Sequence, residues 1–393
     1  MLPVNGSSPK QMSKLLVLLA AGCLTAMTGS LVSPVLPDIV EQLQIDPRWA
    51  GMLVSMHCLT IALFSPLWGI LADRIGKLKV LIPSLILYAL FGSAGALMHS
   101  FGSLLLTRGL VGAASGGIAA ASIGLIGNMY EGETRSRILG YATSGLATTS
   151  IFFPLLGGWV GSTHWQFAFC LYGLALPVAL FAALILREKR NQNTSSIALG
   201  QNEKLVQSLQ QPSTLTLFFA LALTSAVFYV VIIYAPLYFK ATIGAGSVLN
   251  GAILASRAIG AAFVSALGAS RLARRLGIPQ ALALGFILMA LTLIAIPVLR
   301  ELPWILLTAV IFGAGFGIVM PNLYDALAKL TSQELQASIL AIGTGASSLG
   351  QFLSPIFLGP VWKHSGITVF YVGAFVAIVT AVLSLIQIKP SQE

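Results

Sequence analysis

Long stretches of this sequence carry no charged side chain at all. Residues 138 to 186 contain no Asp, Glu, Lys or Arg, and over the whole chain only 9% of residues are charged while 56% are hydrophobic. Soluble domains carry roughly 25% charged residues, so this chain has too little polar surface to cover a globule in water. The sequence therefore predicts an integral membrane protein.

The apolar runs are long and continuous, which favours helices over strands. A hydrocarbon core about 30 Å thick needs about 20 helical residues, whereas the strands of a membrane barrel alternate between apolar and polar residues. We expect an all-α integral membrane protein with twelve transmembrane helices, and we interpret the first span as retained rather than as a signal peptide. The predicted spans cover approximately residues 14–40, 49–72, 79–98, 102–129, 136–160, 164–187, 213–239, 247–270, 278–299, 303–328, 335–360 and 366–388.

Basic residues in the connecting segments predict the orientation. An even number of spans puts both termini on one side, and only Arg48, Lys240, Arg300 and Lys363 fall in loops of the opposite side. Because Lys and Arg accumulate in cytoplasmic loops, we expect both termini in the cytoplasm and a multi-pass protein of the cell (inner or plasma) membrane. The net charge of +10 is then a topology signal, and no nucleic-acid partner is expected.

The three cysteines lie inside apolar runs at Cys23, Cys58 and Cys170, without the spacing of a metal site or a disulfide framework. We interpret them as small core residues. No catalytic constellation of nucleophile, base and metal ligands is present in the sequence either, so we expect no enzyme activity, no metal and no cofactor.

The chain has an internal repeat. A polar segment, residues 188–212, separates residues 1–187 from residues 213–393, each with six spans. Shifting the second half by 201 residues aligns Gly112 with Gly313 and Pro154 with Pro355. Several matches at one offset indicate a duplication. We therefore predict two bundles joined by a cytoplasmic linker.

The segment GILADRIGKLKV, residues 69–80, places several charges between two apolar runs. Asp73 falls where the second span ends, and its carboxylate faces the negative end of its own helix dipole, so it requires a positive partner. The eleventh span begins on the same side near residues 333–337 with unpaired N–H groups. We infer that Asp73 docks there and latches the two halves together, while Gly69 permits close helix approach. The alternative is a solvated, positively charged loop.

This segment resembles the loop motif of the major facilitator superfamily, G-x-x-x-D-R-x-G-[RK]-[RK], through Gly69, Asp73, Arg74, Gly76 and Lys77. Leu78 departs from the final base of the motif. The resemblance implies two six-helix bundles related by a pseudo-twofold axis along the membrane normal, with a substrate site between them near mid-membrane.

Two further stretches resemble motifs of this superfamily. Arg108 and Gly112 are similar to the fourth-span motif R-x-x-x-G, although Arg108 is also shallow enough to snorkel to the surface. Pro154, Gly157 and Gly158 are similar to the fifth-span motif G-x-x-x-G-P-x-x-G-G of the drug:proton antiporter branch, with Thr149 and Phe153 in place of its earlier glycines. The alternative for the fifth span is an ordinary kinked helix.

Two ionisable side chains lie deep in predicted spans. Arg257 falls about 15 Å into the eighth span, close to the midplane, where a charge is costly and indicates function. No acidic residue lies comparably deep, since Asp325 reaches the edge of the tenth span. His57 lies within one residue of the equivalent position in the first half and is a candidate proton carrier, or else a satisfied core histidine.

Other candidates for an amphipathic substrate cavity are polar, aromatic or Met side chains of the first, second, seventh and eleventh spans. Each could instead be packing. They are Met27, Thr28, Met56, Phe228, Tyr229, Tyr234 and Gln351.

The resemblance implies a secondary transporter that works by alternating access and exports small amphipathic compounds, as in drug or metabolite efflux. Proton coupling stays open, because residues 15–37 of the first span lack the acidic residue common in the antiporter branch. The alternative is a transporter of organic anions or phosphorylated metabolites that uses Arg257 and Arg108. The expected partners are a small-molecule substrate and the lipid bilayer, and we expect a monomer.

Overall fold

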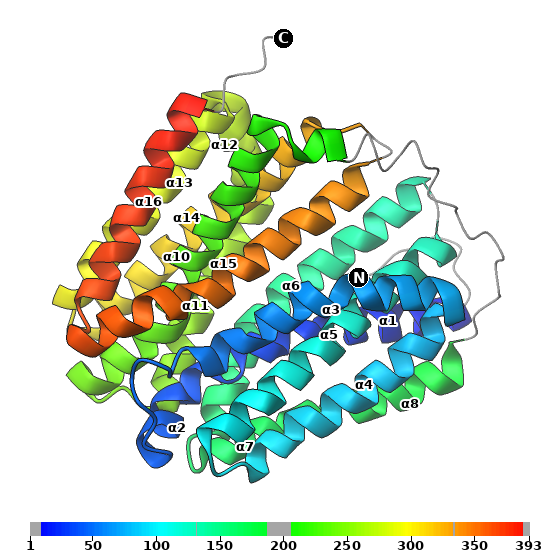
Figure 1. Cartoon of the computed structure of the whole chain (residues 1–393), viewed down its shortest axis with the longest axis horizontal. Coiled ribbons are helices and arrows are strands. Elements are labelled where there is room, and N and C mark those ends of the chain that lie inside the picture. The colour runs from blue at the N-terminus through cyan, green and yellow to red at the C-terminus, as the bar shows by residue number, and fades with distance from the viewer. Residues whose placement is uncertain (1–8, 131, 187–205, 333–334, 388–393) are drawn as a thin grey trace.

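The computed structural model describes residues 9–130, 132–186, 206–332 and 335–387, and every regular element in those ranges is a helix (Figure 1). The helices are α1 (Pro9–Ser30), α2 (Leu36–Gln42), α3 (Met52–Ile75), α4 (Lys77–Ala94), α5 (Phe101–Met129), α6 (Gly132–Val160), α7 (Trp165–Cys170), α8 (Ala175–Ile185), α10 (Pro212–Ile243), α11 (Ser247–Leu267), α12 (Ala269–Leu276), α13 (Ile278–Ala295), α14 (Leu302–Lys329), α15 (Gln336–His364) and α16 (Thr368–Gln387). Short 3-10 turns at 33–35, 95–97, 171–174 and 296–298 extend or join neighbouring helices.

Twelve segments within the described ranges are long and apolar enough to cross a membrane. The first runs from Met12 to Gln42 through α1 and α2, and the sixth joins α7 and α8 from Trp165 to Ile185. The predicted all-α fold with twelve spans is therefore confirmed. Most of the predicted linker, residues 188–205, lies outside the described residues, so the predicted bounds of the two bundles stay a prediction.

Glycines end the helices that precede the third and ninth spans. Gly76, with φ of 108°, separates α3 from α4, and Gly277, with φ of 87°, separates α12 from α13. Only glycine adopts such positive φ values without strain. The two glycines are related by the offset of 201 residues found in the sequence, so the repeat is visible in the backbone as well.

Helices α1–α8 form a first bundle and α10–α16 a second (Figure 1). Each bundle repeats one close helix crossing: α3 packs against α5, and α11 packs against α14. A side chain at Gly112 of α5 would overlap the backbone of His57, and one at Gly313 of α14 would overlap the backbone of Arg257. Glycine at these positions allows the helices to approach closely, which fixes His57 and Arg257 at equivalent places in the two bundles.

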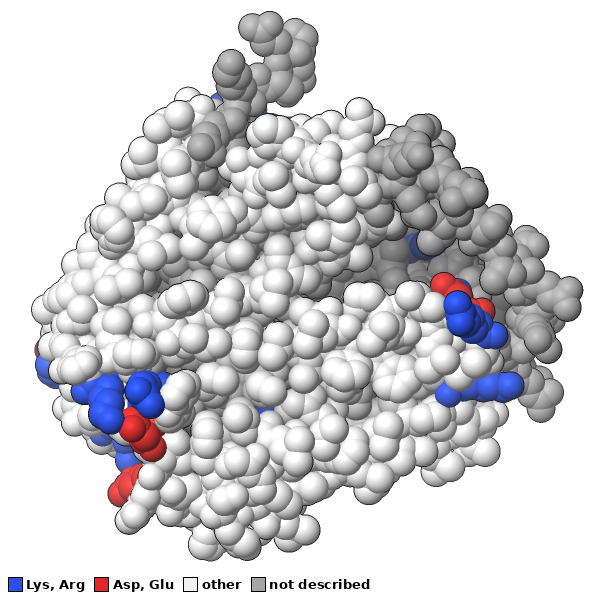
Figure 2. Space-filling model, viewed as in Figure 1, with Lys and Arg blue, Asp and Glu red and all other residues white. Residues whose placement is uncertain are grey.

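We call the side of the membrane where α1 begins and α16 ends the terminus side, and the other the far side. Helices α3 and α15, which belong to different bundles and touch each other, lie close together toward the far side and diverge toward the terminus side (Figure 1). Most Lys, Arg, Asp and Glu on the face shown in Figure 2 gather at two opposite ends of the molecule, with a broad uncharged band between them. That band corresponds to the membrane-embedded part of the helices.

Candidate functional site

Arg257 occupies the middle of α11, and its side chain is only 5% exposed. The guanidinium carbon lies 4.2 Å from the centre of the Phe228 ring on α10, and Phe228 stacks on Phe316 of α14 with ring centres 4.2 Å apart. The buried Nε of Arg257 has no hydrogen-bond partner among the described residues. The deep position inferred from the sequence is thus present, and the guanidinium rests on an aromatic surface rather than in a salt bridge.

Next to this cation, the two bundles meet through a polar junction of four side chains. Cys58 of α3 donates a hydrogen bond to Gln351 Oε1 on α15 at 3.0 Å, and its sulfur lies 3.1 Å from the Tyr229 hydroxyl on α10. His57 Nε2 lies 3.4 Å from the same sulfur, while His57 Nδ1 is buried without a partner. We call His57, Cys58, Tyr229 and Gln351 the junction cluster.

The junction cluster corrects the interpretation of the cysteines. Cys58 is buried, as expected for a core residue, but it links the two bundles through its thiol. Cys170 is exposed on the outer surface of the first bundle rather than in a core, and Cys23 is partly exposed. No regular spacing in the sequence distinguishes Cys58 from the other two, because the contact depends on which helices face the second bundle.

Arg108 is a structural residue of the first bundle and does not snorkel to the membrane surface. Its side chain is 1% exposed and donates hydrogen bonds to the Tyr172 hydroxyl at 3.0 Å and to the Gly92 carbonyl at 3.3 Å. Its guanidinium also lies over the rings of Phe169 and Tyr172. Since these partners all belong to the first bundle, the structure does not place Arg108 beside Arg257 in one binding site.

Four of the other cavity candidates face elsewhere. Met27 is fully buried in the core of the first bundle, and the Thr28 hydroxyl lies 3.1 Å from the Tyr88 hydroxyl inside that bundle. Tyr234 packs against Trp362 near the far side in a tilted arrangement, with ring centres 5.2 Å apart. Met56 is half-buried and packs toward α5. Spacing along a helix identified the right spans, but not the face that each side chain occupies.

Two of the fifth-span residues, Pro154 and Gly158, lie where the two bundles touch. A side chain at Gly158 of α6 would overlap the backbone of Ser247 on α11 and lie tightly against Gly251, and one at Gly251 would overlap the Pro154 carbonyl. Ser247 also donates a hydrogen bond to the Gly158 carbonyl at 3.0 Å. Gly157, by contrast, packs on Leu31 within the first bundle. Tight packing is therefore present despite the substitution of two glycines in this motif.

Two ion pairs, neither recognised from the sequence, also join the bundles on the far side. Lys240 of α10 lies 3.1 Å from Asp38 of α2, and Lys363 of α15 lies 2.9 Å from Asp46 in the loop before α3. The hydrogen bond from Lys363 holds the pKa of the Asp46 carboxyl below its usual value. Lys240 and Lys363 are two of the four basic residues that the sequence assigns to far-side loops. Pairing these two with acidic residues of the same side, such as Asp38 and Asp46, would have predicted the ion pairs.

The loop motif lies at the terminus side and does not join the bundles in this structure. The Asp73 side chain is 67% exposed and lies 3.8 Å from Lys77 on the next helix of its own bundle. Lys77 in turn donates a hydrogen bond to Asn128 of α5 at 2.9 Å. A side chain at Gly69 would meet nothing within 4 Å, so the close helix approach inferred there is absent. Arg74 is exposed, and residues 333–334 of the inferred docking segment lie outside the described residues.

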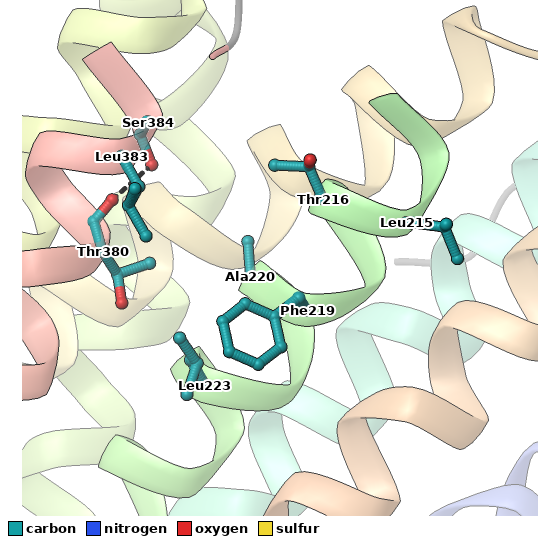
Figure 3. A pocket seen from close by; sticks show the side chains of 8 residues that line it. All are labelled: Leu215, Thr216, Phe219, Ala220, Leu223, Thr380, Leu383 and Ser384. Atoms are coloured by element: carbon teal, nitrogen blue, oxygen red, sulfur yellow. Dashed lines mark hydrogen bonds between the residues drawn. The ribbon is translucent and has the colours of Figure 1, made fainter. Parts of the chain in front are cut away.

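A pocket of about 340 Å³ lies away from these groups, between α10 and α16 (Figure 3). It is lined mainly by apolar side chains, with the hydroxyls of Thr216, Thr380 and Ser384. Its Phe219 is 60% exposed on the outer surface of the second bundle, which faces lipid. Neither Arg257 nor a member of the junction cluster lines this pocket, so we place the candidate site at Arg257 and the junction instead.

Comparisons with known proteins agree with this architecture. The sequence matches the model of the Major Facilitator Superfamily over residues 18–355. Similar relatives are called Multidrug resistance protein MdtG: the protein of Klebsiella pneumoniae (strain 342) is 27% identical over 386 residues, covering 94% of this chain and 92% of the relative. The protein of Escherichia coli O9:H4 (strain HS) is 24% identical over 396 residues, covering 98% and 97%.

Solved structures share the fold. A bacterial homolog of the human lysosomal transporter Spinster, in an inward-facing and occupied conformation, gives a TM-score of 0.78 at 18% identity and covers 97% of this chain and 96% of that one. A D-xylose-proton symporter gives a TM-score of 0.78 at 16% identity and covers 95% and 97%. Both confirm the predicted fold of two six-helix bundles.

Proposed function

Because this chain belongs to the major facilitator superfamily, we propose that it is a secondary transporter that works by alternating access and exports small amphipathic compounds. The protein is a multi-pass membrane transporter rather than an enzyme. The direction of transport, the class of substrate and the coupling ion are the parts of the proposal that need experiment.

The observation that carries the proposal is the unequal interface between the bundles. On the far side, the helices touch at Gly158 and are joined by the pairs Asp38–Lys240 and Asp46–Lys363. Toward the terminus side, α3 and α15 diverge (Figure 1). An interface that is closed at one end only is what a pair of rocking bundles adopts in one of its two states.

The basic loops support a cytoplasmic terminus side, because Lys and Arg are concentrated there. With that orientation, the structure corresponds to the inward-facing state. A compound would then enter from the cytoplasm and reach Arg257 near mid-membrane. Export as the direction of transport rests on two supports, the fifth-span residues Pro154, Gly157 and Gly158 and the similarity to relatives called multidrug resistance proteins.

His57 is our proposed proton-handling residue. No acidic side chain that the structure describes lies in the middle of a span, while His57 lies in the junction cluster where the bundles change contact. His57→Gln, which keeps a polar side chain but cannot carry a proton, should abolish transport driven by a pH gradient while exchange down a substrate gradient continues. Unchanged gradient-driven transport in this variant would remove His57 from the coupling mechanism.

The function is tested with purified full-length protein in liposomes, under imposed pH or sodium gradients, with a mixed library of amphipathic substrates. We expect accumulation of at least one compound against its own gradient. The control is Gly158→Leu, which should insert into the liposomes but not cycle. A passive flux that is too fast for a conformational cycle, and that no ion gradient drives uphill, would indicate a channel and contradict the proposal.

A further inference from the structure

We propose that the substrates of this transporter are amphipathic organic anions, whose oxyanion group binds Arg257 and whose apolar or aromatic body lies against Phe228 and Phe316. This inference rests on the proposed function and names the substrate class of the same site. It also selects between cationic and anionic compounds, which the family alone does not.

The first support is the incomplete coordination of Arg257. The side chain is more than nine-tenths buried at the middle of α11, yet its Nε has no hydrogen-bond partner among the described residues. The contact that the structure gives its charge is the face of the Phe228 ring, at 4.2 Å. A guanidinium presents its donors as a planar fork that matches a carboxylate or phosphate in two parallel hydrogen bonds. An oxyanion would supply the acceptor that the protein does not.

The second support is the distribution of charge around Arg257. The acidic side chains that the structure describes lie at the two ends of the helices, far from the middle of α11. On the far side these are Asp38, Glu41, Asp46 and Glu301, and on the terminus side they are Asp73 and Asp325. A membrane-embedded positive charge without a protein counter-ion repels a cationic compound and attracts an anionic one.

The contrast with Arg108 shows that the arrangement at Arg257 is not a general property of buried arginine in this fold. The two terminal nitrogens of Arg108 each have a protein acceptor, the Tyr172 hydroxyl and the Gly92 carbonyl, and the side chain is enclosed by the first bundle. The Nε of Arg108 is buried without a partner, as is that of Arg257. The two arginines differ at their terminal nitrogens: protein acceptors bind those of Arg108, whereas the contact that the structure gives the Arg257 charge is the Phe228 ring. Arg257 lies beside the interface that changes during transport.

The position of the stacked rings of Phe228 and Phe316 links substrate binding to movement of the bundles. Phe228 precedes Tyr229, whose hydroxyl contacts Cys58 across the interface. A flat apolar group stacked near Phe228 and Phe316 would therefore lie one residue away from a contact that joins the two bundles. Such a ligand has a charged end for Arg257 and an apolar end for the rings, which is the definition of an amphipathic anion.

The test compares the binding of two probes of the same shape, 2-naphthoate and the neutral 2-naphthamide, to the full-length protein in lipid nanodiscs. We expect the wild type to bind the carboxylate at least tenfold more tightly than the amide. Arg257→Gln should bind both probes equally. Arg257→Lys, which keeps the charge but loses the planar fork, should show an intermediate preference.

The matched control is Arg300→Gln. Arg300 also lies near an aromatic ring, that of Tyr238, but it sits in an exposed far-side loop and bonds to the Pro297 carbonyl. Its replacement should leave the preference for naphthoate unchanged. A preference that persists in Arg257→Gln, equal binding of the two probes by the wild type, or binding of neither probe up to millimolar concentration would each overturn the inference.

The two proposals fail separately. If the wild type does not prefer naphthoate but accumulates cationic or neutral compounds in liposomes, the substrate class is wrong and the proposed transport function stands. If it prefers naphthoate through Arg257 but moves no compound of the library in any gradient, the site is correct and the transport function is wrong.

Discussion

The far side and the terminus side of the bundle interface use similar charged residues in different ways. On the far side, the ion pairs Asp38–Lys240 and Asp46–Lys363 each join one bundle to the other. On the terminus side, Asp73 pairs with Lys77 and Asp325 with Lys329, and both pairs lie within a single bundle. Contacts between the bundles therefore mark the closed end, while Asp73 and Asp325 at the other end have partners in their own bundle.

A second difference lies in the backbone contacts. Far-side closure brings α6 and α11 together at Gly158, where no side chain fits, and the Ser33 hydroxyl donates a hydrogen bond to the Ile232 carbonyl. Exposed ion pairs contribute only about 0.2–1 kcal/mol each. Packing of this kind is more sensitive, since inserting extra methylenes into a packed contact costs about 1–3 kcal/mol. We therefore expect the glycine contact to dominate closure of the far side.

The largest effect is expected for Gly158→Leu. The new side chain would overlap the backbone of Ser247, so the far side should no longer close, and transport should fall about tenfold or more. Closure is measured by labelling a cysteine at Ser33, which is fully buried here, with a membrane-impermeant thiol reagent added from the far side. Labelling should increase relative to the chain with Gly158 intact.

The control is Gly140→Leu on the same helix. A side chain at Gly140 would meet nothing within 4 Å, so the same increase in volume should leave labelling and transport unchanged. Equal loss of transport in the two variants would mean that any large residue in α6 is harmful, and the contact at Gly158 would lose its special role.

The next effect concerns Asp73→Asn, which tests whether the terminus side closes through a carboxylate at the start of α15. An exposed carboxylate at a helix N-terminus contributes roughly 0.3–1 kcal/mol, so transport should fall by up to about fivefold through loss of the closed state. Because the side chain is 67% exposed here, the amount of folded protein should not change.

Asp325→Asn is a close control for Asp73→Asn. Asp325 is also an exposed terminus-side acid paired with a lysine four residues away, at 2.8 Å. It should have little effect on transport. If Asp73→Asn transports as well as Asp325→Asn at equal expression, the latch is wrong and the segment is a solvated loop.

Smaller effects are expected from the far-side ion pairs. Lys240→Gln and Lys363→Gln should each raise the labelling of the cysteine at Ser33 roughly 1.5- to 5-fold, the range that corresponds to one exposed pair. A double-mutant cycle isolates the pair: in the presence of Asp38→Asn, Lys240→Gln should have no further effect. Additive effects of the two substitutions would show that Lys240 acts through something other than Asp38.

The fold was predictable because its determinants are local. Apolar runs of about 20 residues define spans, and breaks such as Gly76 with its positive φ define their ends. The depth of Arg257 was predictable for the same reason, since a helix rises a fixed distance per residue. The direction in which a side chain points could not be predicted in this way. Thr28, for example, was expected in the cavity but lies against Tyr88.

The junction and the ion pairs depend on contacts between the bundles, which local pattern does not encode. Cys58 and Gln351 are almost three hundred residues apart, and they meet because α3 and α15 face each other across the interface. The contacts between the bundles also depend on which state of the transport cycle the molecule adopts. A single structure shows the far-side contacts, such as that of Asp46 with Lys363. The pairing expected for Asp73 at the start of α15 stays a prediction, and we expect it only in a state that is closed at the terminus side.

The smallest expected effect is a dependence of far-side closure on acid pH. The ordinary pKa of the Asp46 carboxyl is 3.8, and the hydrogen bond from Lys363 lowers it in the closed state. The closed state therefore favours the ionised carboxylate, and this contribution is complete above the ordinary pKa and lost as the pH falls through the lowered one. Labelling of the cysteine at Ser33 should be constant down to about pH 4 and increase below it. Asp46→Asn should show a higher, pH-independent rate, because its side chain has no proton to gain; an increase that persists in this variant would assign the acid sensitivity to another group.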